Sequence, residues 1–187
     1  MNPQMLIAAV IAVLFVVTTV YLFNTMVGRK NRVHFAFASI DAMLKKRYDL
    51  IPNLVAVAEK YMRFERGVIE EVTALRAKAV SAGLSDDERV DVENGLTRTL
   101  RTLFAVAENY PDLKASGPFL HLQASLNEVE EQLAASRRAF NAAVTDYNNG
   151  CGMFPLNIAA RLMGYRQKPW FEIPEEERQP VRVWGEQ

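Results

Sequence analysis

The sequence predicts an all-α protein in which an N-terminal transmembrane helix leads into an elongated antiparallel helical bundle. Residues Met5–Val27 form an apolar run that is long enough to cross a membrane. After this run, apolar residues recur three and four positions apart, which is the spacing of one face of a helix. We find no segment with the strict alternation of a half-buried β-strand.

The anchor is the first predicted element. Met5–Val27 contains no charged side chain, and the first charged residue of the chain is Arg29. A helix of this length spans about 34 Å, compared with a hydrocarbon core of about 30 Å. A cleaved signal peptide has its basic residues before the apolar run, whereas here they follow it. We therefore expect residues 1–28 to be an anchor that contacts the lipid bilayer.

Basic residues cluster directly after the anchor. Residues 28–47 contain one acidic residue, Asp41, and six basic residues: Arg29, Lys30, Arg32, Lys45, Lys46 and Arg47. Basic loops stay on the cytoplasmic side of a membrane. The charge pattern therefore predicts that the N-terminus lies outside and that the helical domain is cytoplasmic.

Three long segments follow in the helical domain. The first apolar stripe runs from Val33 to Met62 and continues in similar spacing as far as Gly83. A capping box at Ser85–Glu88 predicts the start of the second helix, which stops at Tyr110–Pro111. The third has a strict heptad seam from Phe119 to Tyr147, which favours coiled-coil-like packing against neighbouring helices.

Pro52 leaves two arrangements open. It either kinks one long helix or begins a new helix after an N-cap at Asp49. We favour the kink because the apolar stripe stays in phase from Val33 to Met62. The prediction is then a long kinked helix plus two long helices, and the alternative is a four-helix up-down bundle.

The C-terminal part is expected to be less regular. Gly150 and Gly152 flank Cys151 and predict a break after Asn149, followed by a short amphipathic helix between Leu156 and Gly164. Residues 172–187 have five Glu against two Arg and two prolines, which predicts an extended acidic tail. The expected domains are therefore the anchor at 1–28, the helical bundle at 29–171 and the tail at 172–187.

Composition and motifs argue against several functions. The 22 Lys and Arg residues balance 22 Asp and Glu residues, so no net positive charge favours a nucleic-acid partner. One cysteine excludes a disulfide framework and a CxxC site. His34 and His121 lie outside HExxH and Glu-x-x-His motifs. We expect no enzyme, cofactor, metal or small-molecule substrate, and an enzyme of unknown type using Cys151 is the remaining alternative.

Three stretches of the chain carry a family resemblance. They comprise Ile40–Asp41, Lys46–Val55, Tyr61 and Glu65; then Glu108–Ala115, Phe119, Leu122–Gln123, Leu126 and Glu130; and finally Arg137–Arg138, Phe140–Asn141, Val144, Tyr147–Asn148, Phe154–Pro155, Asn157, Gly164–Tyr165 and Phe171–Glu172. Over about residues 29–172 the chain resembles the LemA family of bacterial membrane proteins. The resemblance implies a single-pass protein of the bacterial inner membrane with an elongated helical domain. It implies no settled activity, but a role in organising or shaping membrane and an association with a membrane zinc protease and TPM-domain proteins.

Two groups of residues are candidates for a hinge or an interaction surface. The first surrounds the proline and consists of Arg47, Tyr48, Asp49, Pro52 and Asn53. We favour a simple structural kink at Pro52. The alternative is a hinge or binding surface, in which Asp49 and Asn53 satisfy the groups that the proline frees. The second lies on the heptad seam and consists of Asn141, Tyr147 and Asn148. These side chains either fix the register between helices or contact a second chain.

These patterns predict a non-enzymatic, membrane-anchored scaffold that forms a homo-oligomer. The alternative is an adaptor that recruits another membrane or cytoplasmic protein, such as a membrane protease, through the kink region or the tail. A third group of side chains is either an interfacial lipid patch or the closure of the bundle's end, and we favour the closure. Its members are Ile158, Leu162, Met163, Tyr165, Trp170 and Phe171, with Arg161, Arg166 and Lys168 among them.

Overall fold

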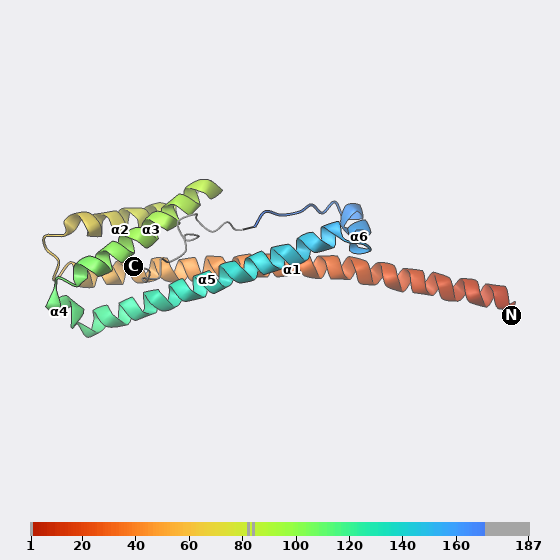
Figure 1. Cartoon of the computed structure of the whole chain (residues 1–187), viewed down its shortest axis with the longest axis horizontal. Helices are drawn as coiled ribbons and strands as arrows, with labels where there is room; N and C mark the ends of the chain where they lie inside the picture. The colour runs from red at the N-terminus through yellow and green to blue at the C-terminus, as the bar shows by residue number, and fades with distance from the viewer. Residues whose placement is uncertain (1, 82, 84, 171–187) are drawn as a thin grey trace, which may run out of the picture. The chain divides into compact units, whose positions relative to one another are not determined.

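The structure is a computed structural model that describes residues 2–81, 83 and 85–170. Within these ranges the chain is helical and contains no strand, which confirms the predicted all-α class (Figure 1). The helices are α1 (Pro3–Ala58), α2 (Arg66–Val80), α3 (Asp86–Ala107), α4 (Pro111–Lys114), α5 (Gly117–Gly152) and α6 (Leu156–Leu162). The predicted tail, 172–187, lies outside the described residues.

The chain divides into two compact units, and α1 and α5 contribute residues to both. We call residues Ile40–Ala134 the bundle unit. Residues Met1–Ser39 together with Ala135–Gln187 are the anchor unit, of which 2–39 and 135–170 are described.

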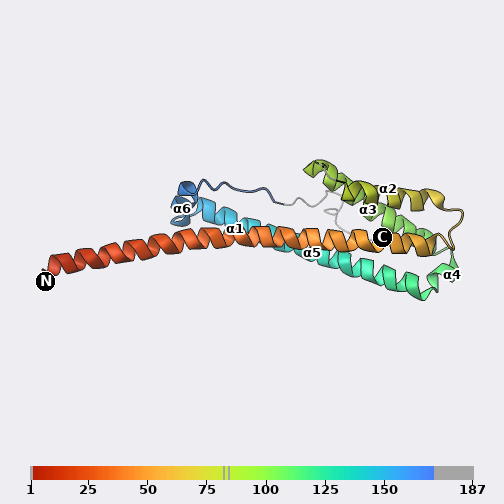
Figure 2. The ribbon, with the colours of Figure 1, turned by 180° about the vertical axis from the view of Figure 1, so that it is seen from behind.

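The bundle unit packs four helical segments around one apolar core. These are the end of α1, α2, α3 and the start of α5, and successive segments alternate in direction (Figures 1 and 2). The core consists of Ile51, Leu54, Ala58, Met62, Ile69, Val72, Leu96, Leu100, Leu103, Ala107, Leu113, Phe119, Leu122 and Leu126. The arrangement is therefore the four-helix up-down bundle that the sequence left as the alternative.

The first helix ends earlier than predicted. It does continue through Pro52, as we expected, but it ends at Ala58 instead of running on towards Gly83. Met62 in the following turn and Ile69 on α2 are buried in the same core. The continuous apolar spacing therefore comes from two antiparallel segments that face one core. No proline or glycine occurs in residues 59–65, so the sequence carries no local signal for this reversal.

The predicted start of α3 is confirmed in atomic detail. Ser85 Oγ accepts a hydrogen bond from the backbone N–H of Glu88 at 3.3 Å, and the Glu88 carboxylate accepts one from the backbone N–H of Ser85 at 3.0 Å. Because the Ser85 N–H donates to the carboxylate, the pKa of Glu88 lies below its usual value. The reciprocal cap fixes where α3 begins.

The anchor unit packs α5 and α6 against α1 near the end of the apolar run. Its core consists of Met26, Val33, Val144, Tyr147, Ala159 and Ala160. Towards the N-terminus, by contrast, the large apolar side chains of α1 from Met5 to Val17 are exposed. By length and composition, α1 is able to cross a membrane.

Gly150 allows α5 to approach α1 closely. A Cβ atom at this position would lie 2.7 Å from the Met26 sulfur and 3.3 Å from Cδ of Arg29. The helix continues past the glycine to Gly152, so the predicted break after Asn149 is wrong by three residues. Gly150 is buried in this interface, and its lack of a side chain leaves room for Met26. It does not end the helix.

Candidate functional site

The guanidinium of Arg47 is the centre of a buried polar network in the bundle unit. Arg47 on α1 is only 2% exposed. Its Nη2 donates a hydrogen bond to Thr97 Oγ1 on α3 at 2.8 Å. Its Nη1 lies 3.5 Å from a carboxylate oxygen of Glu93 on α3 and 3.5 Å from one of Glu130 on α5. One side chain therefore joins α1 to two other helices of the bundle.

Tyr48 adds a second donor to the same network. Its hydroxyl donates a hydrogen bond to the Glu93 carboxylate, whose side chain is buried. Burial raises the pKa of Tyr48, and the hydrogen bond to Glu93 and the negative charge of that residue raise it further. The phenol therefore stays protonated and remains a donor over the whole physiological pH range.

Pro52 explains why a second arginine points at this part of α1. Proline has no N–H, so the carbonyl of Tyr48 four residues earlier loses its helical hydrogen bond. Nε of Arg76 on α2 donates a hydrogen bond to this carbonyl at 3.1 Å. The group that the proline frees is therefore satisfied by a side chain from a neighbouring helix.

The other two residues of the first candidate group have different surroundings. The Asp49 carboxylate pairs with Lys45 at 2.9 Å, and both side chains are exposed. Asn53 is exposed on α1, as is Pro52 itself. The alternative in which Asp49 and Asn53 satisfy the freed groups is therefore corrected, since Arg76 supplies the hydrogen bond. No sequence pattern indicates Arg76, Glu93 or Thr97, because only the folded bundle brings them to α1.

Asn148 of the second candidate group holds a later segment of its own chain. It is buried on α5, and its Nδ2 donates to the backbone carbonyl of Lys168 at 2.8 Å. The backbone N–H of Lys168 donates back to Asn148 Oδ1 at 2.9 Å. Nearby, Nε1 of Trp170 donates to Thr145 Oγ1 at 2.9 Å. The two residues on α5 therefore attach the segment after α6 to the anchor unit.

Tyr147 lies in the core of the anchor unit. Asn141, six residues earlier on α5, is half-buried. The Tyr147 ring lies 6.1 Å from the ring of Tyr165. Burial, with a hydrogen bond to Cys151, raises the pKa of Tyr147 to about 12. A phenol that stays protonated gives the neighbouring thiol no general base.

Several of the basic residues after the apolar run contact α5 and the segment after α6. Arg29 Nη1 donates to the backbone carbonyl of Asp146 at 2.6 Å and lies 3.3 Å from its carboxylate. Arg32 lies 3.4 Å from the same carboxylate. The ammonium of Lys30 lies 4.8 Å from the centre of the Tyr165 ring, in a cation–π contact.

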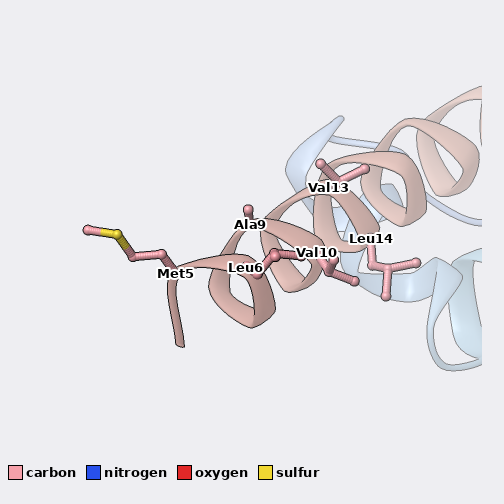
Figure 3. A pocket seen from close by; sticks show the side chains of 6 residues that line it. All are labelled: Met5, Leu6, Ala9, Val10, Val13 and Leu14. Carbon is pink, nitrogen blue, oxygen red and sulfur yellow. The ribbon is translucent and has the colours of Figure 1, made fainter. Parts of the chain in front are cut away.

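The part of the chain that the structure describes holds no metal-ligand cluster and has an apolar hollow near its N-terminal end. Within the described ranges, no group of three or more His, Cys, Asp and Glu side chains is placed to hold a metal ion. A hollow of about 540 Å³ near the N-terminus is lined by Met5, Leu6, Ala9, Val10, Val13 and Leu14 of α1 (Figure 3). These side chains are all apolar and come from one helix, so they fit hydrocarbon and carry no group that orients a substrate.

Comparison with known proteins identifies the family. The LemA family model matches residues 36–184 of the chain. The chain belongs to the LemA family. Over 91% of its length it is 24% identical to Magnetosome protein MamQ 2 of Paramagnetospirillum magneticum, of which the match covers 72%. Protein LemA of Metamycoplasma hominis is 25% identical over 90% of this chain and 81% of that relative. These names denote no enzyme. The similarity to these relatives and the apolar N-terminal half of α1 both fit a membrane protein.

The hydrogen bond between Arg76 and the Tyr48 carbonyl is tested by a double-mutant cycle. Arg76→Met leaves this carbonyl without a partner, which we expect to lower the free energy of unfolding by about 1–3 kcal/mol. In a Pro52→Ala background the alanine N–H restores the helical bond, so the same substitution should cost at least about 1 kcal/mol less. Denaturant unfolding of the detergent-solubilised protein measures both values. An equal cost in the two backgrounds would contradict this role.

Removing the charge at Arg47 is expected to destabilise the bundle strongly. Arg47→Met leaves Glu93 buried without its cation, which typically costs about 3–5 kcal/mol. The matched control is Lys45→Met, two residues away on the same helix. Its exposed pair with Asp49 should be worth at most about 0.5 kcal/mol. If the two variants unfold at the same denaturant concentration, the network contributes nothing to stability.

Tyr48 makes stability depend on alkaline pH. Its native pKa lies above the unfolded value of about 10, so its contribution is complete below that pH and is lost as the pH rises through the native pKa. The free energy of unfolding should therefore fall less between mildly and strongly alkaline pH in Tyr48→Phe than in the wild type. Tyr61→Phe, at an exposed position in the turn after α1, is the control. If the free energy of unfolding of Tyr48→Phe fell with pH as much as that of the wild type, Tyr48 would not be the group responsible.

Proposed function

We propose that this LemA-family protein is a non-enzymatic, single-pass scaffold that self-associates through its membrane-spanning helix and organises the membrane around it. The observation that carries the proposal is the apolar half of α1, whose large side chains from Met5 to Val17 are exposed. Lipid and other copies of the helix are the surroundings that suit such a surface.

The heptad seam of α5 is not available for self-association. Leu126, Val129 and Leu133 are buried within the bundle unit, and Val144 and Tyr147 are buried within the anchor unit. The seam therefore serves the packing of its own chain. This shifts the expected contact between copies from the coiled-coil pattern to α1.

Polar side chains within the apolar run offer a contact between helices. The hydroxyls of Thr19 and Thr25 donate to the carbonyls of Phe15 and Tyr21, each at 2.8 Å, so they are used within α1. Asn24 is exposed on the same helix. An amide side chain in hydrocarbon gains by pairing with the same group of another helix. Asn24 is therefore the residue through which we expect copies to associate.

The membrane role and the orientation rest on further support. The similarity to proteins named for magnetosomes favours a role in organising a membrane. The basic residues within 28–47 favour a bacterial inner-membrane protein with its N-terminus outside and its helical domain in the cytoplasm. The names of the matched relatives denote no enzyme, which favours a function without catalysis.

An adaptor is the second candidate. Pro52 and Asn53 face outward from the bundle unit, although a proline inside a helix costs stability. An exposed surface of this kind suits a partner, such as another membrane protein.

The mass of the full-length protein in detergent, from light scattering with correction for detergent, tests self-association. We expect a discrete multiple of the chain mass. Asn24→Leu should raise the dissociation constant about threefold to tenfold, the effect of one interhelical hydrogen bond of about 0.6–1.4 kcal/mol. Thr25→Val is the control, because its hydroxyl bonds within α1. A mass equal to that of one chain at every protein concentration would overturn self-association and favour the adaptor.

A further inference from the structure

Four large apolar side chains gather where α5 ends and α6 begins. Met153, Phe154, Ile158 and Leu162 are exposed, and the exposed fraction is 80% for Phe154 and 73% for Leu162. The junction is folded against α1, since Ala159 and Ala160 of α6 belong to the same core as Met26. The exposed side chains are therefore held on an ordered surface of the anchor unit, and they are not the end of a loose tail.

The register of α5 against α1 sets the depth of this surface. The two helices are antiparallel, with Asp146 beside Arg29 and Gly150 against Met26 (Figures 1 and 2). α5 ends at Gly152, two residues after Gly150, which corresponds to about 3 Å further along the helix direction. Leu22 and Phe23 of α1 pack against the core to which Ala159 and Ala160 of α6 belong. The apolar run of α1 ends at Val27, so the end of α5 and α6 lie beside the last residues of that run.

Basic side chains accompany the exposed apolar ones. Arg161 is exposed on α6 between Ile158 and Leu162, and Arg166 is exposed shortly after the helix. Apolar side chains with cations directly beside them match the boundary between acyl chains and phosphate groups.

We propose that Met153, Phe154, Ile158 and Leu162 form a second membrane-contacting surface, which inserts into the interfacial layer of the bilayer that α1 spans. The occupant of this surface is phospholipid, with its phosphate groups near Arg161 and Arg166. The inference rests on the proposed membrane-spanning role of α1. It corrects the expectation that the C-terminal apolar residues only close a bundle, because Met163 and Tyr165 pack inside whereas Ile158 and Leu162 do not.

Depth-dependent fluorescence quenching tests this surface in the full-length protein. In a Cys151→Ala background, single cysteines at Phe154 and Leu162 are labelled with a small fluorophore after reconstitution into phosphatidylcholine–phosphatidylglycerol vesicles. Lipids brominated near the start of the acyl chain serve as the quencher for positions 154 and 162, and lipids brominated near its end serve for position 16. Val16→Cys, in the middle of the apolar run, is the positive reference. Phe64→Cys, 92% exposed in the turn of the bundle unit, is the negative one.

We expect quenching at positions 154 and 162 to exceed that at position 64 about threefold or more, as for a group that enters the interface. Quenching at position 16 but not at 154 and 162 would overturn the second surface and leave the membrane-spanning helix in place. A lack of quenching at position 16 would overturn the proposed function itself. Disulfide cross-links between chains at position 154, without quenching, would assign the surface to a second copy and refute lipid contact.

Discussion

The buried guanidinium of Arg47 is the constraint on which the register of the bundle unit depends. A charge removed from water is tolerated only where carboxylates and acceptors meet it. Those of Glu93, Thr97 and Glu130 come from α3 and α5, so a shift of one turn in either helix would move a partner about 5 Å away. Apolar packing is not directional, whereas the contacts of Arg47 need the observed register.

Pro52 creates a similar need for a polar partner in the backbone of α1. It removes one hydrogen bond of α1, and Arg76 of α2 replaces it at the Tyr48 carbonyl. The side chain of Tyr48 meanwhile donates to Glu93. Residues 47 and 48 therefore make polar contacts from α1 to α2, α3 and α5, and one of these contacts exists because the proline frees a carbonyl.

Local patterns predicted the elements that depend on neighbouring residues in sequence. The capping box at Ser85 and the apolar run of Met5–Val27 are of this kind, and both occur as helix features in the structure. The reversal after Ala58 was missed because its cause is the burial of Met62 in a core assembled from four segments. For the same reason Arg47 and Pro52 stood out in the sequence, while Glu93 and Arg76 did not. Arg76 and Glu93 acquire their roles only when the fold brings them to Tyr48 and Arg47, which lie 28 and 46 residues away in the sequence.

A comparable dependence on close contact governs the anchor unit. Gly150 brings α5 close to Met26, and this approach places Ala159 and Ala160 of α6 on the same core. Small residues at three contact points allow the C-terminal elements to lie beside the last turns of the apolar run. The large residues of the same segment, Phe154 and Leu162, then have no protein surface to cover them in the described chain. The packing that orders α6 is thus also the reason why Ile158 and Leu162 stay exposed on the outside of the anchor unit.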